Sequence, residues 1–239
     1  MGSLAGTITT LTGPPTIDFT ATGVADWRFW GLTTGTTDDH KVIGGSVANR
    51  ISGLTQVGGA FTALRASIPA TITWTDGSPD TTASTTIAIA INIVGRGWSF
   101  TVPASLASSV VNVYVSVSRA AGTITATLSD ASATAYSDSS TTNSSSTLIN
   151  KYQFTYTANS AGQTLTIQWT EITNFTSGAV QLCGVTLDHA PTSLAITQAT
   201  AASSSTGIIT QGLPIWTPEL DMSSQLPPAF FMPDRVVPY

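Results

Sequence analysis

The feature that most constrains the fold is an alternation of apolar and small polar residues that recurs up to about residue 190. Alternation with a period of two places successive side chains on opposite faces of a β-strand. It is clearest in five segments, residues 87–93, 111–117, 124–128, 152–156 and 165–169. Each segment would have one buried and one solvated face, as strands of packed antiparallel sheets do. The sequence therefore predicts an all-β chain, with no helix before residue 190.

Short polar connections separate these segments. Residues 120–122 and 158–163 are predicted to form short hairpins, and residues 137–147, nearly all Ser, Thr and Asn, a long surface loop. Strands about ten residues apart without helical crossovers are typical of sandwiches and jelly rolls. We expect an antiparallel, jelly-roll-like β-sandwich over residues 16–189, preceded by an N-terminal strand or arm over residues 1–15.

The composition excludes several classes of function. Only 9% of the residues are charged and the net charge is −5, whereas about 25% charged residues is typical. Without a basic cluster we expect no nucleic-acid partner. No apolar run is long enough to span a membrane as a helix, and residues 1–10 lack the pattern of a secretory signal. The single cysteine, Cys183, precludes an intrachain disulfide and is expected to be a small buried residue.

From about residue 190 the alternation stops. Residues 190–207 are rich in Ala, Ser and Thr and are expected to be a spacer, whereas residues 208–239 contain repeated prolines among apolar side chains. Proline does not fit inside helices or central strands, but each large apolar side chain gains about 1.5–3 kcal/mol on burial. We therefore predict an extended C-terminal arm, residues 208–239, that docks through Trp216, Phe230, Phe231, Met232 and Tyr239.

Residues 26–32, Asp-Trp-Arg-Phe-Trp-Gly-Leu, form the densest aromatic cluster. Trp27 and Trp30 have two interpretations. They could pack in the core, since Trp is a large apolar residue, or they could form a flat surface on which sugar rings stack. In a strand, two residues three apart need not share a face.

Residues 38–41, Asp-Asp-His-Lys, are predicted to be a polar turn. Loop carboxylates can also hold Ca²⁺, so Asp38 or Asp39 could supply one ligand to a structural Ca²⁺ ion. No other cofactor is expected.

The sequence offers little for catalysis. The two Glu residues are Glu171 and Glu219, the two His residues are His40 and His189, and no Gly-x-Ser-x-Gly motif is present. We predict that the chain is not an enzyme.

Several of these pieces occur in a familiar order, namely residues 26–32, 39–41, 74–79, 113–115, 126–130 and 160–165. In this order the chain resembles a Ser/Thr-rich jelly-roll module of bacteriophage virion proteins and bacterial surface proteins. The resemblance covers roughly residues 16–189. Its motifs are turns and core aromatics, so it implies a fold and no active-site residues.

The sequence and the resemblance together favour a non-enzymatic structural protein of a bacteriophage virion, assembled in the host cytoplasm. A capsid decoration, head-fibre or tail-associated adaptor protein would bind other virion proteins and further copies of itself through its arm. The alternative is a carbohydrate-binding module of a surface or secreted protein, with glycans as partners. An extracellular matrix or S-layer component is a third class, which the absence of an export signal disfavours.

Overall fold

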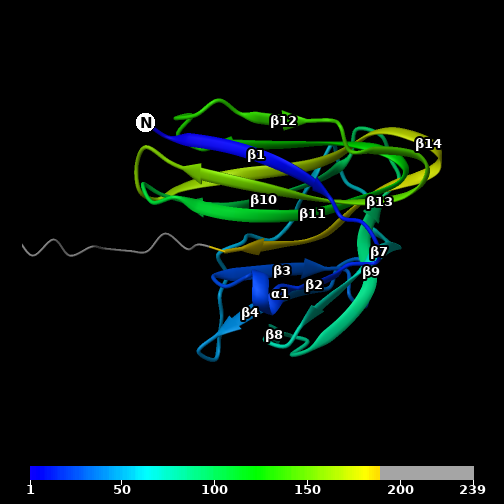
Figure 1. Cartoon of the computed structure of the whole chain (residues 1–239), viewed down its shortest axis with the longest axis horizontal. Helices are drawn as coiled ribbons and strands as arrows, with labels where there is room; N and C mark the ends of the chain where they lie inside the picture. The colour runs from blue at the N-terminus through cyan, green and yellow to red at the C-terminus, as the bar shows by residue number, and fades with distance from the viewer. Residues whose placement is uncertain (189–239) are drawn as a thin grey trace, which may run out of the picture. The chain divides into compact units, whose positions relative to one another are not determined.

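Two long strands, β11 and β14, form the centre of an all-β fold with one short helix. The computed structural model describes residues 1–188 (Figure 1). The elements are, in chain order, β1 (Ser3–Thr10), β2 (Thr16–Asp18), α1 (Phe19–Thr22), β3 (Asp26–Trp30), β4 (Asp38–Ile43), β5 (Ser46–Val47), β6 (Thr55–Val57), β7 (Leu64–Trp74), β8 (Gly77–Ser78), β9 (Ala83–Ile91), β10 (Gly97–Ala104), β11 (Ser109–Leu128), β12 (Tyr136–Asp138), β13 (Thr142–Thr157) and β14 (Gln163–Leu187).

The strands form one mixed sheet whose main path runs β1-β13-β11-β14-β3-β4-β5. Nearly every pairing in it is antiparallel, but β2 lies parallel to β7. The prediction of an all-β fold is confirmed, but the prediction of no helix is wrong because of the four-residue α1, and the sheet is mixed instead of purely antiparallel.

The sheet curls because β11 and β14 turn back together in the middle of their length (Figure 1). Residues 111–118 of β11 pair with residues 179–187 of β14, whereas residues 120–128 pair with residues 165–174. The register shifts on both sides of residues 120–121, and Arg119 has a positive φ of 46°. Bulges of this kind bend a strand and increase its twist. The hairpin predicted at residues 120–122 is therefore wrong: this segment is the bent middle of a single strand.

The second predicted hairpin, residues 158–163, is also wrong. β13 and β14 do not pair with each other in the described part of the chain, because both pair with β11 from opposite sides. The long polar loop predicted at residues 137–147 is wrong in part, since β13 begins at Thr142 and pairs with the bend of β11. Thr and Ser suit an exposed strand as well as a loop, so composition could not separate the two.

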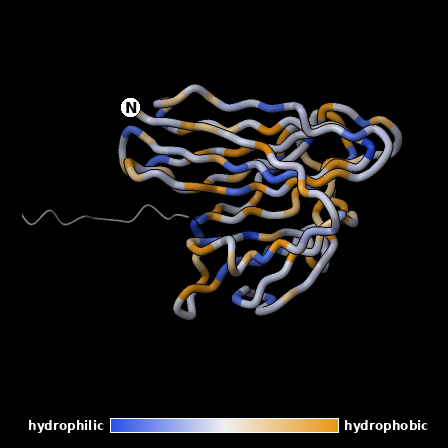
Figure 2. Tube along the Cα trace, viewed as in Figure 1, coloured by the Kyte–Doolittle hydropathy of each residue, from blue (hydrophilic) through white to orange (hydrophobic). Residues whose placement is uncertain are grey.

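Two hydrophobic cores lie on opposite faces of this curled sheet. The first core fills the inside of the curl and contains Val113, Tyr156 and Ile167. The second core lies against the other face and contains Phe19, Trp27 and Trp74, among others. Orange, apolar stretches of chain lie within the strands that border these cores (Figure 2).

Both faces of residues 111–117 of β11 are covered, so the solvated face expected there is absent, whereas residues 123–128 keep the expected alternation. Asn112, Tyr114 and Ser116 are as buried as the valines between them. The Tyr114 ring stacks on Phe19 of the second core, with ring centroids 5.7 Å apart. β9 shows the same effect, because Ala88 joins the second core and Ile89 the first.

Candidate functional site

Strand β3 carries the aromatic segment, and all five of its residues are buried. It lies between β14 and β4. Trp27 and Phe29 face the second core, whereas Trp30 faces the first. The two indoles are therefore on opposite faces, with exposed fractions of 0% and 4%. The sugar-stacking surface considered for this pair is not formed, because neither ring lies open on the surface.

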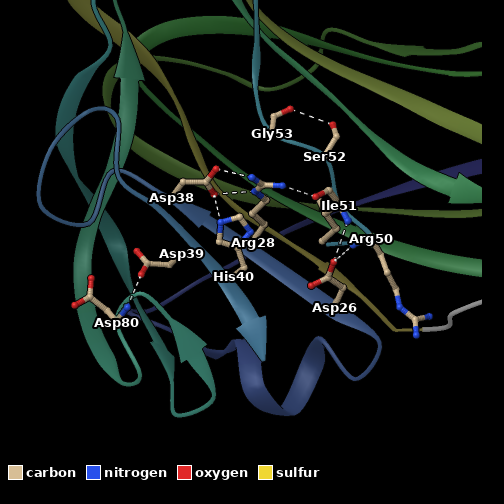
Figure 3. Close-up of polar contacts among 10 residues, drawn as sticks. All are labelled: Asp26, Arg28, Asp38, Asp39, His40, Arg50, Ile51, Ser52, Gly53 and Asp80. Carbon is tan, nitrogen blue, oxygen red and sulfur yellow. Dashed lines mark hydrogen bonds and ion pairs between the residues drawn. The ribbon is translucent and has the colours of Figure 1, made fainter. Parts of the chain in front are cut away.

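Between and around these rings lies a charged cluster made of Asp26, Arg28, Asp38, Asp39, His40 and Asp80 (Figure 3). Its centre is a bidentate ion pair from β3 to β4. Arg28 Nε donates to Asp38 Oδ1 at 2.7 Å, and Arg28 Nη2 donates to Asp38 Oδ2 at 2.5 Å. The third guanidinium nitrogen, Nη1, donates to the carbonyl oxygen of Ile51 at 2.5 Å. Arg28 thus joins two strands and the loop before β6 with a geometry that Lys cannot reproduce.

Asp26 holds the same loop from the neighbouring position on β3. Its Oδ2 accepts hydrogen bonds from the backbone N–H groups of Arg50 at 2.7 Å and Ile51 at 2.9 Å. Burial raises the pKa of Asp26, although these two donors and the charge of Arg28 oppose the rise. The role of Asp26 in this geometry is to position the loop.

Asp39 and His40 lie on β4 and point to opposite sides of it. Asp39 is fully buried and its Oδ1 accepts from the backbone N–H of Asp80 at 3.1 Å. Burial raises the pKa of Asp39 to about 6, and the nearby Asp80 carboxyl adds to the rise. Burial lowers the pKa of His40, and Arg28 lowers it further while Asp38 opposes the shift. Neutral imidazole is therefore favoured at neutral pH.

These contacts change the interpretation of Asp38–Asp39 as a Ca²⁺-binding turn. Residues 38–43 form strand β4 instead of a turn. Both oxygens of Asp38 accept from Arg28, and Asp39 lies inside the protein on the other face. Within the described residues, no three His, Cys, Asp or Glu side chains are grouped so as to hold a metal ion.

A second ion pair lies further along β4. Lys41 Nζ donates to Asp76 Oδ2 at 2.5 Å, while Thr20 and the Nε1 of Trp27 donate to Asp76 Oδ1. Burial alone would raise the pKa of Asp76, but the hydrogen bonds from Lys41, Thr20 and Trp27 together lower it below its ordinary value. Trp27 therefore has a satisfied donor and a structural role.

A pocket of about 530 Å³ lies beside the charged cluster. Its walls come from strands and loops distant in sequence, and they include Trp30, Leu54, Phe61, Ile89 and Trp98. Of the residues that line the pocket, the sequence identified Trp30 and Asp38 as candidate site residues, but not Leu54, Phe61, Ile89 or Trp98. Phe61 follows residues 57–60, which contain two glycines. Neither this pattern nor the position of Trp98 in the sequence indicates that Phe61 and Trp98 lie beside Trp30.

Glu171 is a buried acidic residue to which no sequence pattern draws attention. It lies on β14 beside the bend, is fully buried, and its Oε1 accepts from Asn174 Nδ2 at 3.0 Å. Its Oε2 has no hydrogen-bond partner among residues 1–188. Burial raises its pKa to about 7 despite the bond from Asn174.

Cys183 is fully buried, as predicted, and burial raises the pKa of its thiol.

The candidate docking residues Trp216, Phe230, Phe231, Met232 and Tyr239 lie outside the described residues, as do His189 and Glu219. Among the described residues, no helix is long and apolar enough to cross a membrane. No family model, curated protein or solved structure matches the chain.

Proposed function

We propose that this chain is a non-enzymatic structural protein of a bacteriophage virion, acting as a capsid decoration, head-fibre or tail-associated adaptor protein. In this proposal the curled sheet is a jelly-roll-like sandwich, and residues 208–239 form an extended arm. The arm binds other virion proteins, further copies of the same chain among them.

The observation that carries the proposal is the open edge of β1. This strand pairs only with β13 among the described strands, so the backbone groups on its outer side have no ladder partner there. Its eight residues include no charged residue and no proline. Proteins usually protect edge strands with Lys, Pro or a bulge, because an open edge accepts strands from other chains. β1 is therefore a suitable acceptor for strand addition.

The neighbouring strand β12 covers one face of β1 and leaves this edge open. Gly6 makes room for the Tyr136 ring, since a Cβ at residue 6 would lie 2.6 Å from Tyr136 Cε2. Tyr136 also packs edge-on against Phe154, which is opposite Gly6 in the ladder. β1 is thus held firmly in place, which lowers the entropic cost of adding another strand to it.

The composition of residues 208–239 supplies the matching partner. Ordering an arm costs about 1–2 kcal/mol per residue in backbone entropy. Backbone pairing at a sheet edge and apolar anchors in pockets can offset that cost, and this combination is known from strand-addition complexes. An arm of this kind suits a permanent assembly better than a transient encounter.

A photo-crosslinking experiment on the full chain tests this proposal. A photoreactive phenylalanine analogue replaces Phe230, and isotopically light and heavy copies are mixed before assembly. The proposal predicts cross-links between light and heavy copies or to other virion proteins. Cross-links found exclusively within one chain would contradict it, because the arm would then fold on its own sandwich.

The alternative function, a carbohydrate-binding module at the cell surface or outside the cell, loses the exposed pair of indoles on which it first depended. Trp27 is satisfied inside the second core. Trp30 keeps one relevant property, since it lines the pocket beside the charged cluster.

A further inference from the structure

The pocket beside the charged cluster lies where β3 and β9 approach β6 and β10. Its volume of about 530 Å³ falls within the range of about 300–1,000 Å³ that is usual for small-molecule sites. Aromatic and aliphatic side chains form its floor, and the threonines Thr34, Thr36, Thr37 and Thr62 stand around it. An apolar floor with a hydroxyl-bearing rim is the usual design of a site for a small polar ligand.

The floor of the pocket contains aromatic rings in fixed positions. Trp98 is 2% exposed, and Phe61 packs edge-on against it with ring centroids 5.6 Å apart. The Trp30 ring packs against Phe100 at 6.0 Å and lies under the Arg28 guanidinium at 5.9 Å. These contacts hold the rings before any ligand arrives, so little ordering cost remains for binding.

The charges and amides in the wall of the pocket are already paired. Asp38 lines the pocket, but both of its oxygens accept from Arg28. Gln56 also lines it, and its amide is engaged twice with the backbone of Phe61, at 2.8 Å and 3.0 Å. A charged ligand would find no opposite charge to balance its desolvation. The pocket therefore favours a neutral ligand.

One donor in the wall remains unused. Among the residues that line the pocket, Trp30 alone keeps a buried donor, Nε1–H, that has no acceptor among residues 1–188. Leaving such a group unpaired costs about 1–3 kcal/mol. This nitrogen is closed to solvent, so its N–H signal would report a ligand in the pocket through the Trp30 ring without bonding to it.

We propose that this pocket binds a neutral sugar ring of a glycan. The apolar C–H face of such a ring would pack on the half-buried Phe61, and its hydroxyl groups would bond to the threonines around the pocket. The inference does not depend on the virion function, because a sugar site would serve a decoration protein and a surface protein alike.

NMR of the full ¹⁵N-labelled chain tests the proposal through the indole N–H signals. The probes are lactose, cellobiose and N-acetylglucosamine, with glucuronate as a charged control. We expect the Trp30 and Trp98 signals to shift and saturate with the best neutral sugar, and glucuronate to bind at least tenfold more weakly. The Trp27 and Trp74 signals should not move, because their N–H groups donate to Asp76 and to the carbonyl oxygen of Asp80.

Matched variants separate the pocket from other surfaces. Phe61→Ala removes a ring from the pocket, and Gln56→Leu removes both bonds that hold the Phe61 backbone. Each should weaken sugar binding at least tenfold. Phe175→Ala removes an exposed ring, 45% accessible, that does not line the pocket, and should leave binding unchanged.

Two results would overturn the proposal. One is the absence of any sugar-dependent shift at Trp30 and Trp98. The other is an equal response to cyclohexanol and to the sugars, which would make the pocket a general apolar site.

Discussion

Arg28 and Asp38 form two parallel hydrogen bonds from β3 to β4, 2.7 Å and 2.5 Å long. The Arg28 side chain is only 11% exposed, so its charge depends on this partner. With Ile51 accepting the remaining nitrogen, Arg28 fixes the position of Trp30 and of the loop that leads toward the pocket.

Removal of the carboxylate from this pair should destabilise the protein. We expect Asp38→Asn to lower the free energy of unfolding by about 1–3 kcal/mol, because Arg28 would keep a largely buried charge with a weaker acceptor. Urea denaturation measures the loss. In a double-mutant cycle with Arg28→Met, the double variant should lose less than the sum of the two single losses. Strict additivity would show that the pair does not couple the strands.

Gly122 lies at the bend of β11, where the Trp169 ring occupies the space that a side chain at residue 122 would need. A Cβ at residue 122 would lie 2.2 Å from Cη2 of Trp169, which is fully buried. Gly122→Ala should therefore cost about 1–3 kcal/mol through overpacking. Gly53→Ala is the matched control, since its Cβ would meet only Arg28 Nη2 at 3.6 Å. Equal stability of the two variants in thermal unfolding would contradict this role of Gly122.

Glu171 should make stability depend on pH near neutrality. Its pKa in the folded protein is raised from 4.5 to about 7, so the folded state binds more protons than the unfolded state between these values. Stability should fall as pH rises through this window. The raised pKa of Asp39, about 6, acts in the same direction. Urea midpoints measured from pH 4.5 to 8 follow the effect.

Glu171→Gln isolates the contribution of this residue. The amide keeps an oxygen for the hydrogen bond from Asn174 Nδ2 and cannot ionise. We expect the variant to lose a large part of the pH dependence and to gain up to about 3 kcal/mol relative to the parent above pH 7. An unchanged pH profile would show that Glu171 does not titrate in this range.

A charge added at the edge of β1 should reduce incorporation into particles without changing the stability of the fold. Thr7→Lys places a cation on the exposed face of this edge strand, a device that proteins use to prevent strand addition. We expect the free energy of unfolding to change by less than about 0.5 kcal/mol, while incorporation into particles falls. The control is Thr155→Lys, an exposed position on the neighbouring internal strand β13. Equal incorporation of the two variants would contradict the acceptor role of β1.

The sequence predicted the strands better than it predicted their connections. The alternation in residues 111–117 and 124–128 correctly indicated extended chain, because side-chain periodicity is a local property. Gly122 between them was interpreted as part of a turn. A glycine fits this position because the Trp169 ring, from β14, occupies the space of a side chain. No local pattern contains this tertiary contact.

The candidate site shows the same limit. The sequence identified Trp30 and Asp38 as unusual residues, but their pairing into strands β3 and β4 decides what each contacts. Phe61 and Trp98 meet Trp30 through the tertiary arrangement of β3, β10 and the loop after β6, which no local pattern contains. The burial that raises the pKa of Glu171 likewise depends on the bend, and a lone Glu among threonines gives no sign of it.

The decisive measurement for the virion proposal is the incorporation of a chain that lacks residues 208–239. Particles purified from infected cells that supply either the full chain or the truncated chain are compared for the amount of this protein they contain, with circular dichroism of the truncated chain as a check of its fold. We expect a folded truncated protein that is absent from the particles. A truncated chain incorporated as well as the full chain would contradict the proposal.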